Sequence, residues 1–197
     1  AQKRLYFLQQ MDLESTAYNM PLILPVGKEI NRQAFESTLK QLIARHESLR
    51  TSFIKVNDAA VQKIHPPEDI EFEIEYYDLA TEDTDNRKQE TKEILQDKKL
   101  PTANCQLPTD FVRPFDLSGA PLVRSGIIRH PGGNHTWIVD IHHIVSDGTS
   151  HMILADDFMS FYEGNSSGLE PLRLQYKDFS QWQNGLFASG VIKAQED

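Results

Sequence analysis

The spacing of apolar residues along the chain predicts a fold that mixes helices and strands. Apolar residues at helical spacing lead us to interpret four segments as helices: residues 2–11, 31–46, 149–163 and 176–188. Residues 82–100 are dominated by charge and are interpreted as a solvated surface helix. Asn31 is a suitable N-cap for the helix over 31–46. The side chains predicted to face inward from the helix over 149–163 are Met152, Ala155, Phe158, Met159 and Tyr162. The last helix carries the aromatic residues Phe179, Trp182 and Phe187.

Other segments have the composition or alternation of β-strands. They cover residues 17–26, 49–55, 60–65, 71–77, 121–129 and 136–144. Pro21 and Pro25 assign the first strand to a sheet edge, where a missing N–H is tolerated. Residues 131–134, Pro-Gly-Gly-Asn, predict a hairpin turn between the last two strands. Together these elements predict an α/β sandwich with one sheet covered by helices.

The segment that carries candidate chemistry is residues 137–150. If its first part is a strand, successive side chains alternate between faces, so His142 and His143 point in opposite directions. One imidazole can then face a cleft while the other is satisfied inside the fold, where Asp140 is a plausible partner. We expect His143 to be the working histidine and His142 the structural one.

The residues after the histidine pair predict a turn into a helix. Asp147 and Gly148 break the strand, and Thr149 and Ser150 suit a helix start. The imidazole of His143 is then expected near a helix N-terminus, which favours developing negative charge. Gly148 allows backbone to approach a ligand closely, and Asp147 is expected to hold the turn by pairing with a cation. A histidine in this setting suits acyl transfer to an amine or hydroxyl.

Two simpler interpretations of the histidine pair stay open at this point. Paired histidines are more often packed and hydrogen-bonded than catalytic. A metal site formed by His143, Asp147 and His151 would need these residues on one continuous helix, and Gly148 argues against that helix. We therefore assign neither a metal nor a directly bound cofactor to the chain.

Composition narrows the range of functions. The chain has 197 residues with 39% hydrophobic and 9% aromatic residues, which suits one globular domain with a sizeable core. A net charge of -9 argues against nucleic-acid binding, and no apolar run is long enough to cross a membrane. The single cysteine, Cys105, excludes an intrachain disulfide and fits a cytoplasmic location. Because the first residues, 1–4, contain no initiator Met, we expect the chain to be part of a longer protein.

Residues 142–148 resemble the HHxxxDG core motif of the condensation domains of nonribosomal peptide synthetases, and Ser150 follows as in that family. Further segments resemble other motifs of the family in the expected order: residues 1–8, 45–53, 115–117, 121–124 and 176–182. The resemblance spans nearly the whole chain.

The resemblance implies a chloramphenicol-acetyltransferase-like fold with two lobes around a tunnel. Residues 1–170 would form the N-terminal lobe, a two-layer sandwich with a mixed sheet, and residues 171–197 would begin the connection to a C-terminal lobe that this chain lacks. Upstream and downstream peptidyl carrier proteins would present substrates on phosphopantetheine arms at opposite ends of the tunnel.

The resemblance also assigns roles to individual residues. His143 would assist the acceptor amine as it attacks the donor thioester to form an amide. Whether it acts as a general base or positions the amine stays open, and we favour positioning with hydrogen bonding. Asp147 would be the structural acid of the motif, paired with an arginine of the second motif, Arg45 in preference to Arg50. Without the second lobe, we expect the chain alone to be inactive.

Three rival functions share parts of the pattern. Epimerisation domains have the same histidine motif but a different opening motif, and residues 18–21 also resemble condensation domains. A free-standing trimeric acyltransferase would have a similar length, although residues 45–53 argue against it. A degenerate domain that only recruits partners would be expected to lose the motif.

Overall fold

The structure, a computed structural model, describes residues 2–57, 59–80, 108, 110–165 and 168–190. The predicted helix over 82–100 and the cysteine at position 105 lie outside these residues. The described helices and strands follow one another as α1 (Gln2–Met11), β1 (Asn19–Gly27), α2 (Arg32–Arg45), η1 (Glu47–Arg50), β2 (Thr51–Val56), β3 (Ala59–Ile64), η2 (Pro67–Asp69), β4 (Glu75–Asp78), β5 (Val123–Arg129), β6 (His135–His142), α4 (Gly148–Tyr162) and α5 (Tyr176–Ser189). The mixture of elements is the predicted α/β class.

The main sheet has four strands in the order β1-β6-β5-β4. β5 and β6 form the predicted hairpin, paired from Val123↔Ile141 to Arg129↔His135. β4 runs parallel to β5, whereas β1 runs antiparallel to β6, so the sheet is mixed as predicted. β1 lies at one edge, which accommodates its two prolines because an edge strand leaves one row of N–H groups unpaired. β2 and β3 form a separate hairpin.

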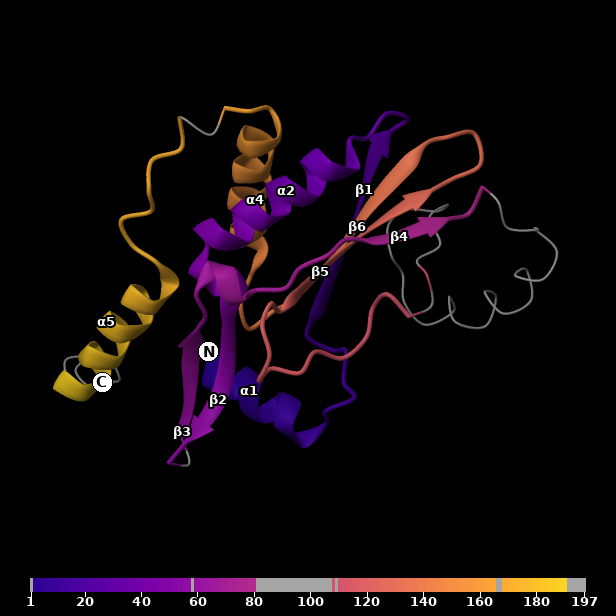
Figure 1. The fold of residues 1–197 in the computed structure, drawn as a ribbon. Helices are drawn as coiled ribbons and strands as arrows, with labels where there is room; N and C mark the ends of the chain where they lie inside the picture. Colours follow the sequence, from indigo (N-terminus) through magenta and orange to yellow (C-terminus); the bar gives the residue numbers. More distant parts are fainter. Residues whose placement is uncertain (1, 58, 81–107, 109, 166–167, 191–197) are drawn as a thin grey trace.

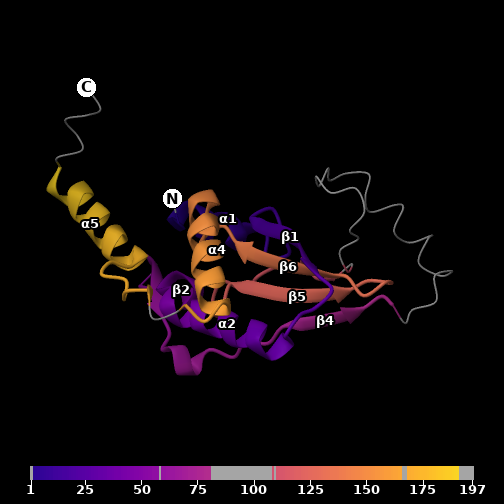
Figure 2. The ribbon, with the colours of Figure 1, turned by 90° about the horizontal axis from the view of Figure 1, so that it is seen from above.

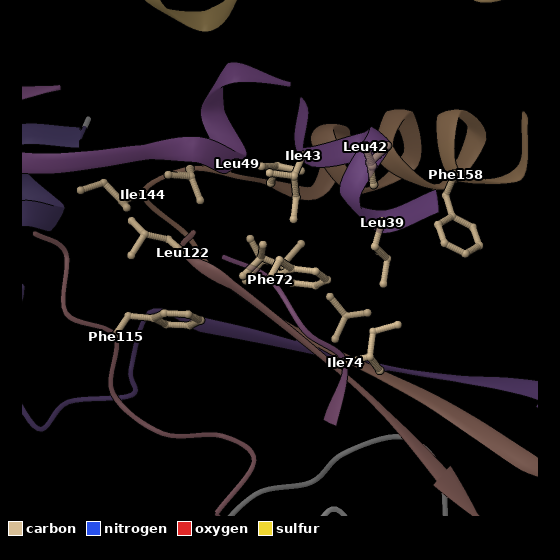
Figure 3. Close-up of a cluster of buried hydrophobic side chains, with 14 of the residues drawn as sticks. Leu39, Leu42, Ile43, Leu49, Phe72, Ile74, Phe115, Leu122, Ile144 and Phe158 are labelled. Atoms are coloured by element: carbon tan, nitrogen blue, oxygen red, sulfur yellow. The ribbon is translucent and has the colours of Figure 1, made fainter. Parts of the chain in front are cut away.

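Helices α2 and α4 cover one face of the main sheet (Figures 1 and 2). Asn31 caps α2 as predicted, since its side-chain oxygen accepts from the Ala34 N–H at 3.0 Å. Figure 3 shows the buried side chains of α2 and α4 directed toward residues of the sheet layer. The buried residues of this cluster that the figure labels are Leu39, Leu42, Ile43, Leu49, Phe72, Ile74, Phe115, Leu122, Ile144 and Phe158. This core includes Ile141 and Ile144, so it holds in place the end of β6 and the histidine pair between them.

Four predicted strands begin later than expected, and the difference has a structural reason in β2 and β4. Residues 47–50 form the 3-10 helix η1, so β2 starts at Thr51 rather than at residue 49. The predicted strand over 71–77 is wrong for its first half, because β4 spans only Glu75–Asp78. Phe72 and Ile74 are buried as their alternation indicated, but ladder pairing to β5 starts at Glu75. Alternation reports which side chains are buried and does not report whether the backbone has a partner strand.

The predicted inward face of α4 is partly wrong. Phe158 is buried and Tyr162 half-buried, but Met152 and Met159 are 65% and 50% exposed, and Ala155 is exposed too. The face that packs includes Asp157, which is only 8% exposed. From the sequence alone, an aspartate in a helix is expected on the exposed face. The prediction therefore placed Asp157 outside and Met152 and Met159 inside, whereas the structure shows the reverse.

Helix α5 differs from the other long helices because none of its residues is buried. Its aromatic side chains Phe179, Trp182 and Phe187 are 46%, 61% and 60% exposed. In Figure 2 the helix projects from the rest of the molecule.

Candidate active site

The two histidines at the end of β6 differ in exposure. His142 is the last residue of the strand and is 0% exposed, whereas His143 is exposed. The His143 N–H donates to the Tyr18 carbonyl at 2.8 Å, which anchors the chain beside β1. The Val145 N–H then donates to the His142 carbonyl at 3.1 Å and closes a turn. His143 lies in this turn, and its side chain is exposed to solvent.

His142 is a buried, neutral histidine. Its Nδ1 accepts from the Ile144 N–H at 3.1 Å, so the ring proton lies on Nε2, which faces Oε1 of Gln9 at 3.4 Å. Burial is the main cause that lowers the pKa of His142 to about 4, and the charges of His143 and Arg124 add to it. The prediction that Asp140 is the hydrogen-bond partner of the His142 ring is wrong. The Asp140 carboxylate instead accepts from Nδ2 of Asn19 at 2.7 Å and pairs with Arg124 at 3.0 Å.

His143 carries the opposite tautomer. Its Nδ1 lies 2.8 Å from the carbonyl oxygen of Ser146. Because a carbonyl oxygen can only accept, Nδ1 is the protonated nitrogen, and Nε2 of the neutral ring keeps a free lone pair. The exposed ring therefore offers one oriented hydrogen-bond acceptor to whatever lies beside it.

Asp147 is the N-cap of α4. Its Oδ1 accepts from the Ser150 N–H at 2.8 Å and from the Ser150 hydroxyl at 2.7 Å. These two hydrogen bonds to Ser150 are the main reason that the pKa of Asp147 is lowered. The carboxylate thus occupies the start of the helix itself and fixes the geometry of the turn that holds His143.

The sequence profile of condensation domains matches residues 1–197, the whole chain. The chain belongs to the condensation-domain family. It is 40% identical over its whole length to gramicidin S synthase 2 of Brevibacillus brevis and 36% identical to surfactin synthase subunit 1 of Bacillus subtilis. It spans only 4% and 5% of those two proteins.

Solved condensation domains share the fold. The chain superposes on the first condensation domain of the CDA synthetase with a TM-score of 0.73 and 17% identity, covering 98% of this chain and 47% of that one. For the starter condensation domain of rhizomide synthetase, the TM-score is 0.70 at 19% identity, covering 98% and 44%. The chloramphenicol-acetyltransferase-like fold expected from the sequence is confirmed.

The predicted pairing of Arg45 with Asp147 is wrong in this condensation domain. Nε of Arg45 donates to Oδ2 of Asp157 at 2.8 Å, and Nε2 of His46 lies 2.7 Å from the same oxygen. Asp157 lies on the buried face of α4, whereas Asp147 is exposed and already bound to its own helix. Arg45 therefore joins α2 to α4 and does not contact the motif.

Arg50, the alternative partner predicted for Asp147, does not pair with it, and the role predicted for Gly148 is not explained by packing. Arg50 donates to the His65 carbonyl and lies 3.6 Å from the Glu47 carboxylate, so it supports the β2–β3 hairpin. A Cβ built on Gly148 would meet no described atom within 4 Å apart from its chain neighbours. Gly148 has no steric reason to be glycine within the described residues, so its close approach to a ligand stays a prediction.

Sequence reasoning missed two glutamines, Gln2 and Gln9, that contact the histidine turn. Gln9 is 1% exposed although it lies in a helix with exposed polar neighbours. Gln9 lies on the same helical face as Leu5 and Tyr6, and this position could have indicated that it is buried. Within the described residues, no three His, Cys, Asp or Glu side chains gather closely enough to hold a metal ion. None of the described helices has the length and apolar character needed to cross a bilayer.

Proposed function

We propose that the chain is the N-terminal half of a peptide-synthetase condensation domain that joins a donor acyl thioester to the amine of an acceptor. The observation that carries this proposal is the oriented ring of His143. Its Nδ1–H is held by the Ser146 carbonyl at 2.8 Å, which leaves Nε2 as an acceptor on an exposed ring. An acceptor amine is a neutral nucleophile with N–H groups that this nitrogen can bind.

In this proposal the amine of the acceptor donates a hydrogen bond to Nε2 of His143 while its lone pair attacks the thioester carbonyl carbon. The new C–N bond forms as the C–S bond breaks. The proton lost by the amine passes to the leaving thiolate, directly or through Nε2. Positioning is the larger contribution, because an amine attacks a thioester with less base assistance than water needs to attack an amide.

The substrates and partners follow from the same proposal. Carrier proteins upstream and downstream present the donor and the acceptor on phosphopantetheine arms, and the chain binds no cofactor of its own. Residues 1–170 form the lobe that carries the motif, and residues 171–197 begin the connection to a second lobe. The share of the two solved condensation domains that this chain covers, 44% and 47%, supports the existence of a second lobe. We place the reaction in the cytoplasm, which suits a chain with one cysteine.

The proposal is tested by His143→Ala in the synthetase module that contains this chain, supplied with both loaded carrier proteins. We expect amide formation to fall by at least about 100-fold, the lower range for loss of a proton-transfer or positioning group. Thr149→Ala, an exposed neighbour on the first turn of α4, is the control and should keep wild-type turnover. Unchanged synthesis by the His143→Ala module would refute the proposed role.

A second experiment tests the division into halves. The 197-residue chain alone, incubated with both loaded carriers, is expected to release no amide product. Clear turnover by this chain would show that a second lobe is not required and would favour a self-sufficient acyltransferase.

A further inference from the structure

One face of α1 contacts the histidine turn through two glutamines. Gln2 and Gln9 are seven residues apart, so they lie on the same side of the helix. Nε2 of Gln2 donates to the Ile144 carbonyl at 2.7 Å. Oε1 of Gln9 faces Nε2 of His142 at 3.4 Å. The residues that flank His143 on both sides are therefore each bound by α1.

The amide of Gln9 has a fixed orientation. Its Nε2 approaches three backbone carbonyls of the loop after α1, those of Asp12 at 3.4 Å, Leu13 at 3.4 Å and Ser15 at 3.0 Å. Carbonyls can only accept, so the amide nitrogen points to this loop and the amide oxygen points to His142. Gln9 thus selects the Nε2–H tautomer of His142, the same tautomer that the Ile144 N–H requires at Nδ1.

Gln2 is also bound from the other side. Nε2 of Gln62, on β3, donates to Oε1 of Gln2 at 2.7 Å and reaches Oγ of Ser180, on α5, at 3.3 Å. An amide NH₂ has two protons, so Gln62 can make both bonds at once. A continuous path of hydrogen bonds then runs from Ser180 through Gln62 and Gln2 to the Ile144 carbonyl.

We propose that Gln2 is a positioning residue for His143 and that Gln2, Gln62 and Ser180 form a relay that couples α5 to the histidine turn. The inference rests on the proposed function of His143. Gln2 touches the turn at the carbonyl of Ile144, the residue directly after His143, and so acts through the backbone rather than on substrate. Consecutive amide hydrogen bonds polarise one another, so a change at one end of the relay alters the bond at the other.

The relay borders a groove between α5, α1 and β3 with a volume of about 860 Å³. Gln2, Gln62 and Ser180 all line this groove. α5 has no buried residue, and polar bonds from Gln175, Lys177 and Ser180 join it to the rest of the chain. The hydrogen bonds of these three side chains give α5 a direct route to the turn of His143.

The first test compares Gln2→Ala with Gln10→Ala in the 197-residue chain, because Gln10 is exposed on the same helix. ¹⁵N NMR of the imidazole rings reports the tautomer of His143, and hydrogen exchange reports the Val145 amide that closes the turn. In Gln2→Ala we expect a smaller Nδ1–H fraction for His143 and exchange at Val145 about tenfold faster, the loss of one hydrogen bond to the turn. Gln10→Ala should match wild type. A Gln2→Ala chain with wild-type tautomer and exchange overturns the inference.

The second test addresses the relay and also serves if Gln2→Ala does not fold. Gln62→Leu should change the same two readouts in the same direction, and Ser180→Ala should change them less, while Lys63→Leu on the exposed side of β3 leaves them unchanged. The double variant Gln2→Ala with Gln62→Leu should be no worse than Gln2→Ala alone, because both break one path. Additive effects, or no effect of Gln62→Leu, would overturn the relay.

The third test separates this inference from the proposed function. In the intact condensation domain, Gln2→Ala should lower kcat for amide formation by about tenfold with little change in KM, the signature of a displaced catalytic group. If the NMR readouts change but kcat does not, the positioning of His143 by Gln2 stands and the catalytic role of His143 fails. If His143→Ala abolishes synthesis while Gln2→Ala leaves the ring and kcat unchanged, the role of Gln2 fails alone.

Discussion

Helices α2 and α5 have a similar content of apolar residues but opposite surroundings. α2 presents Phe35, Leu39 and Ile43 to the sheet, and each is at most 4% exposed. α5 keeps Phe179, Trp182 and Phe187 at 46% exposed or more. The aromatic residues at its start contact one another, with ring centroids of Tyr176 and Phe179 5.8 Å apart and of Phe179 and Trp182 5.7 Å apart. An apolar stripe therefore predicts a buried face only if the chain also provides the surface that covers it.

The two helices also differ in how they are held. α2 is held by burial of apolar area along its length, whereas α5 is anchored at its first turn by polar bonds. Nε2 of Gln175 donates to the Arg45 carbonyl at 3.0 Å, and the Glu47 N–H donates to Oε1 of Gln175 at 3.2 Å. Lys177 pairs with Glu47 at 2.7 Å. Exposed apolar faces of this kind mark interaction surfaces, which agrees with a proposed second lobe that would cover α5.

The largest expected effect on stability comes from replacing a phenylalanine of α2 by alanine, compared with the same replacement on α5. Phe35 is 2% exposed and packs against Trp137, Phe158 and Tyr162 with ring centroids 4.9, 4.9 and 5.7 Å away. Phe35→Ala should lower the free energy of unfolding by about 4 kcal/mol, the cost of a cavity in an aromatic cluster. Phe187→Ala on α5 should change it by less than about 0.5 kcal/mol. Urea titration of both variants measures the two values, and similar losses would show that α5 is packed in solution.

Acid should weaken the packed region before it affects α5. The folded pKa of His142 is about 4, below the ordinary value of 6.5, because the ring is buried. As the pH falls below about 6.5 the unfolded chain binds this proton first, so stability is fully present above 6.5 and decreases until the pH reaches about 4. A shift of that size corresponds to a loss of about 3 kcal/mol. The lowered pKa of His46, also caused mainly by burial, acts in the same direction.

The measurement is a series of urea titrations from pH 7 to pH 4 on wild type and on His142→Asn. The asparagine side chain can still accept from the Ile144 N–H but does not titrate. The variant is expected to be less stable at pH 7 and to show a much shallower decrease with acid. An equally steep decrease in His142→Asn would mean that other groups carry the pH dependence.

The contrast between these helices also shows what the sequence could predict. The cap and buried face of α2 were predictable because Asn31 precedes four apolar residues that recur at helical spacing, Phe35, Leu39, Leu42 and Ile43. Strand alternation predicts an exposed His143, but β6 ends at His142, so the turn after the strand gives this exposure. The buried face of α4 was not, because Asp157 occupies it, and its partners Arg45 and His46 are more than 100 positions away in the chain.

The partner of Arg45 was not predictable for a related reason. Asp147 and Asp157 were both available, and only the folded chain shows that Asp147 is bound to Ser150 in its own helix. The contacts of Gln2 with Gln62 and Ile144 likewise join three distant segments. Local patterns predict elements and their exposed or buried faces, whereas the choice among distant polar partners depends on how those elements pack.

The smallest expected effect on stability concerns Asp157. Its partner Arg45 lies on the buried helix α2 and also contacts the segment that leads to the exposed helix α5. Arg45 binds Asp157 through Nε, donates to the Glu170 carbonyl through Nη1 at 2.7 Å, and accepts from Gln175 through its own carbonyl. Asp157→Asn keeps the size of the side chain but removes the charge that Arg45 faces. We expect it to lower the free energy of unfolding by about 2 kcal/mol, within the range for hydrogen bonds to charged groups.

The control for this variant is Asp156→Asn, the exposed neighbour on α4, which should change stability by less than about 0.5 kcal/mol. Hydrogen exchange then locates the effect. Since the same arginine anchors the segment that leads to α5, amides at the start of α5 should exchange faster in Asp157→Asn, while those in the middle of α2 should follow global unfolding. Unchanged exchange at the start of α5 would show that Gln175 and Lys177 hold this helix without help from the buried ion pair.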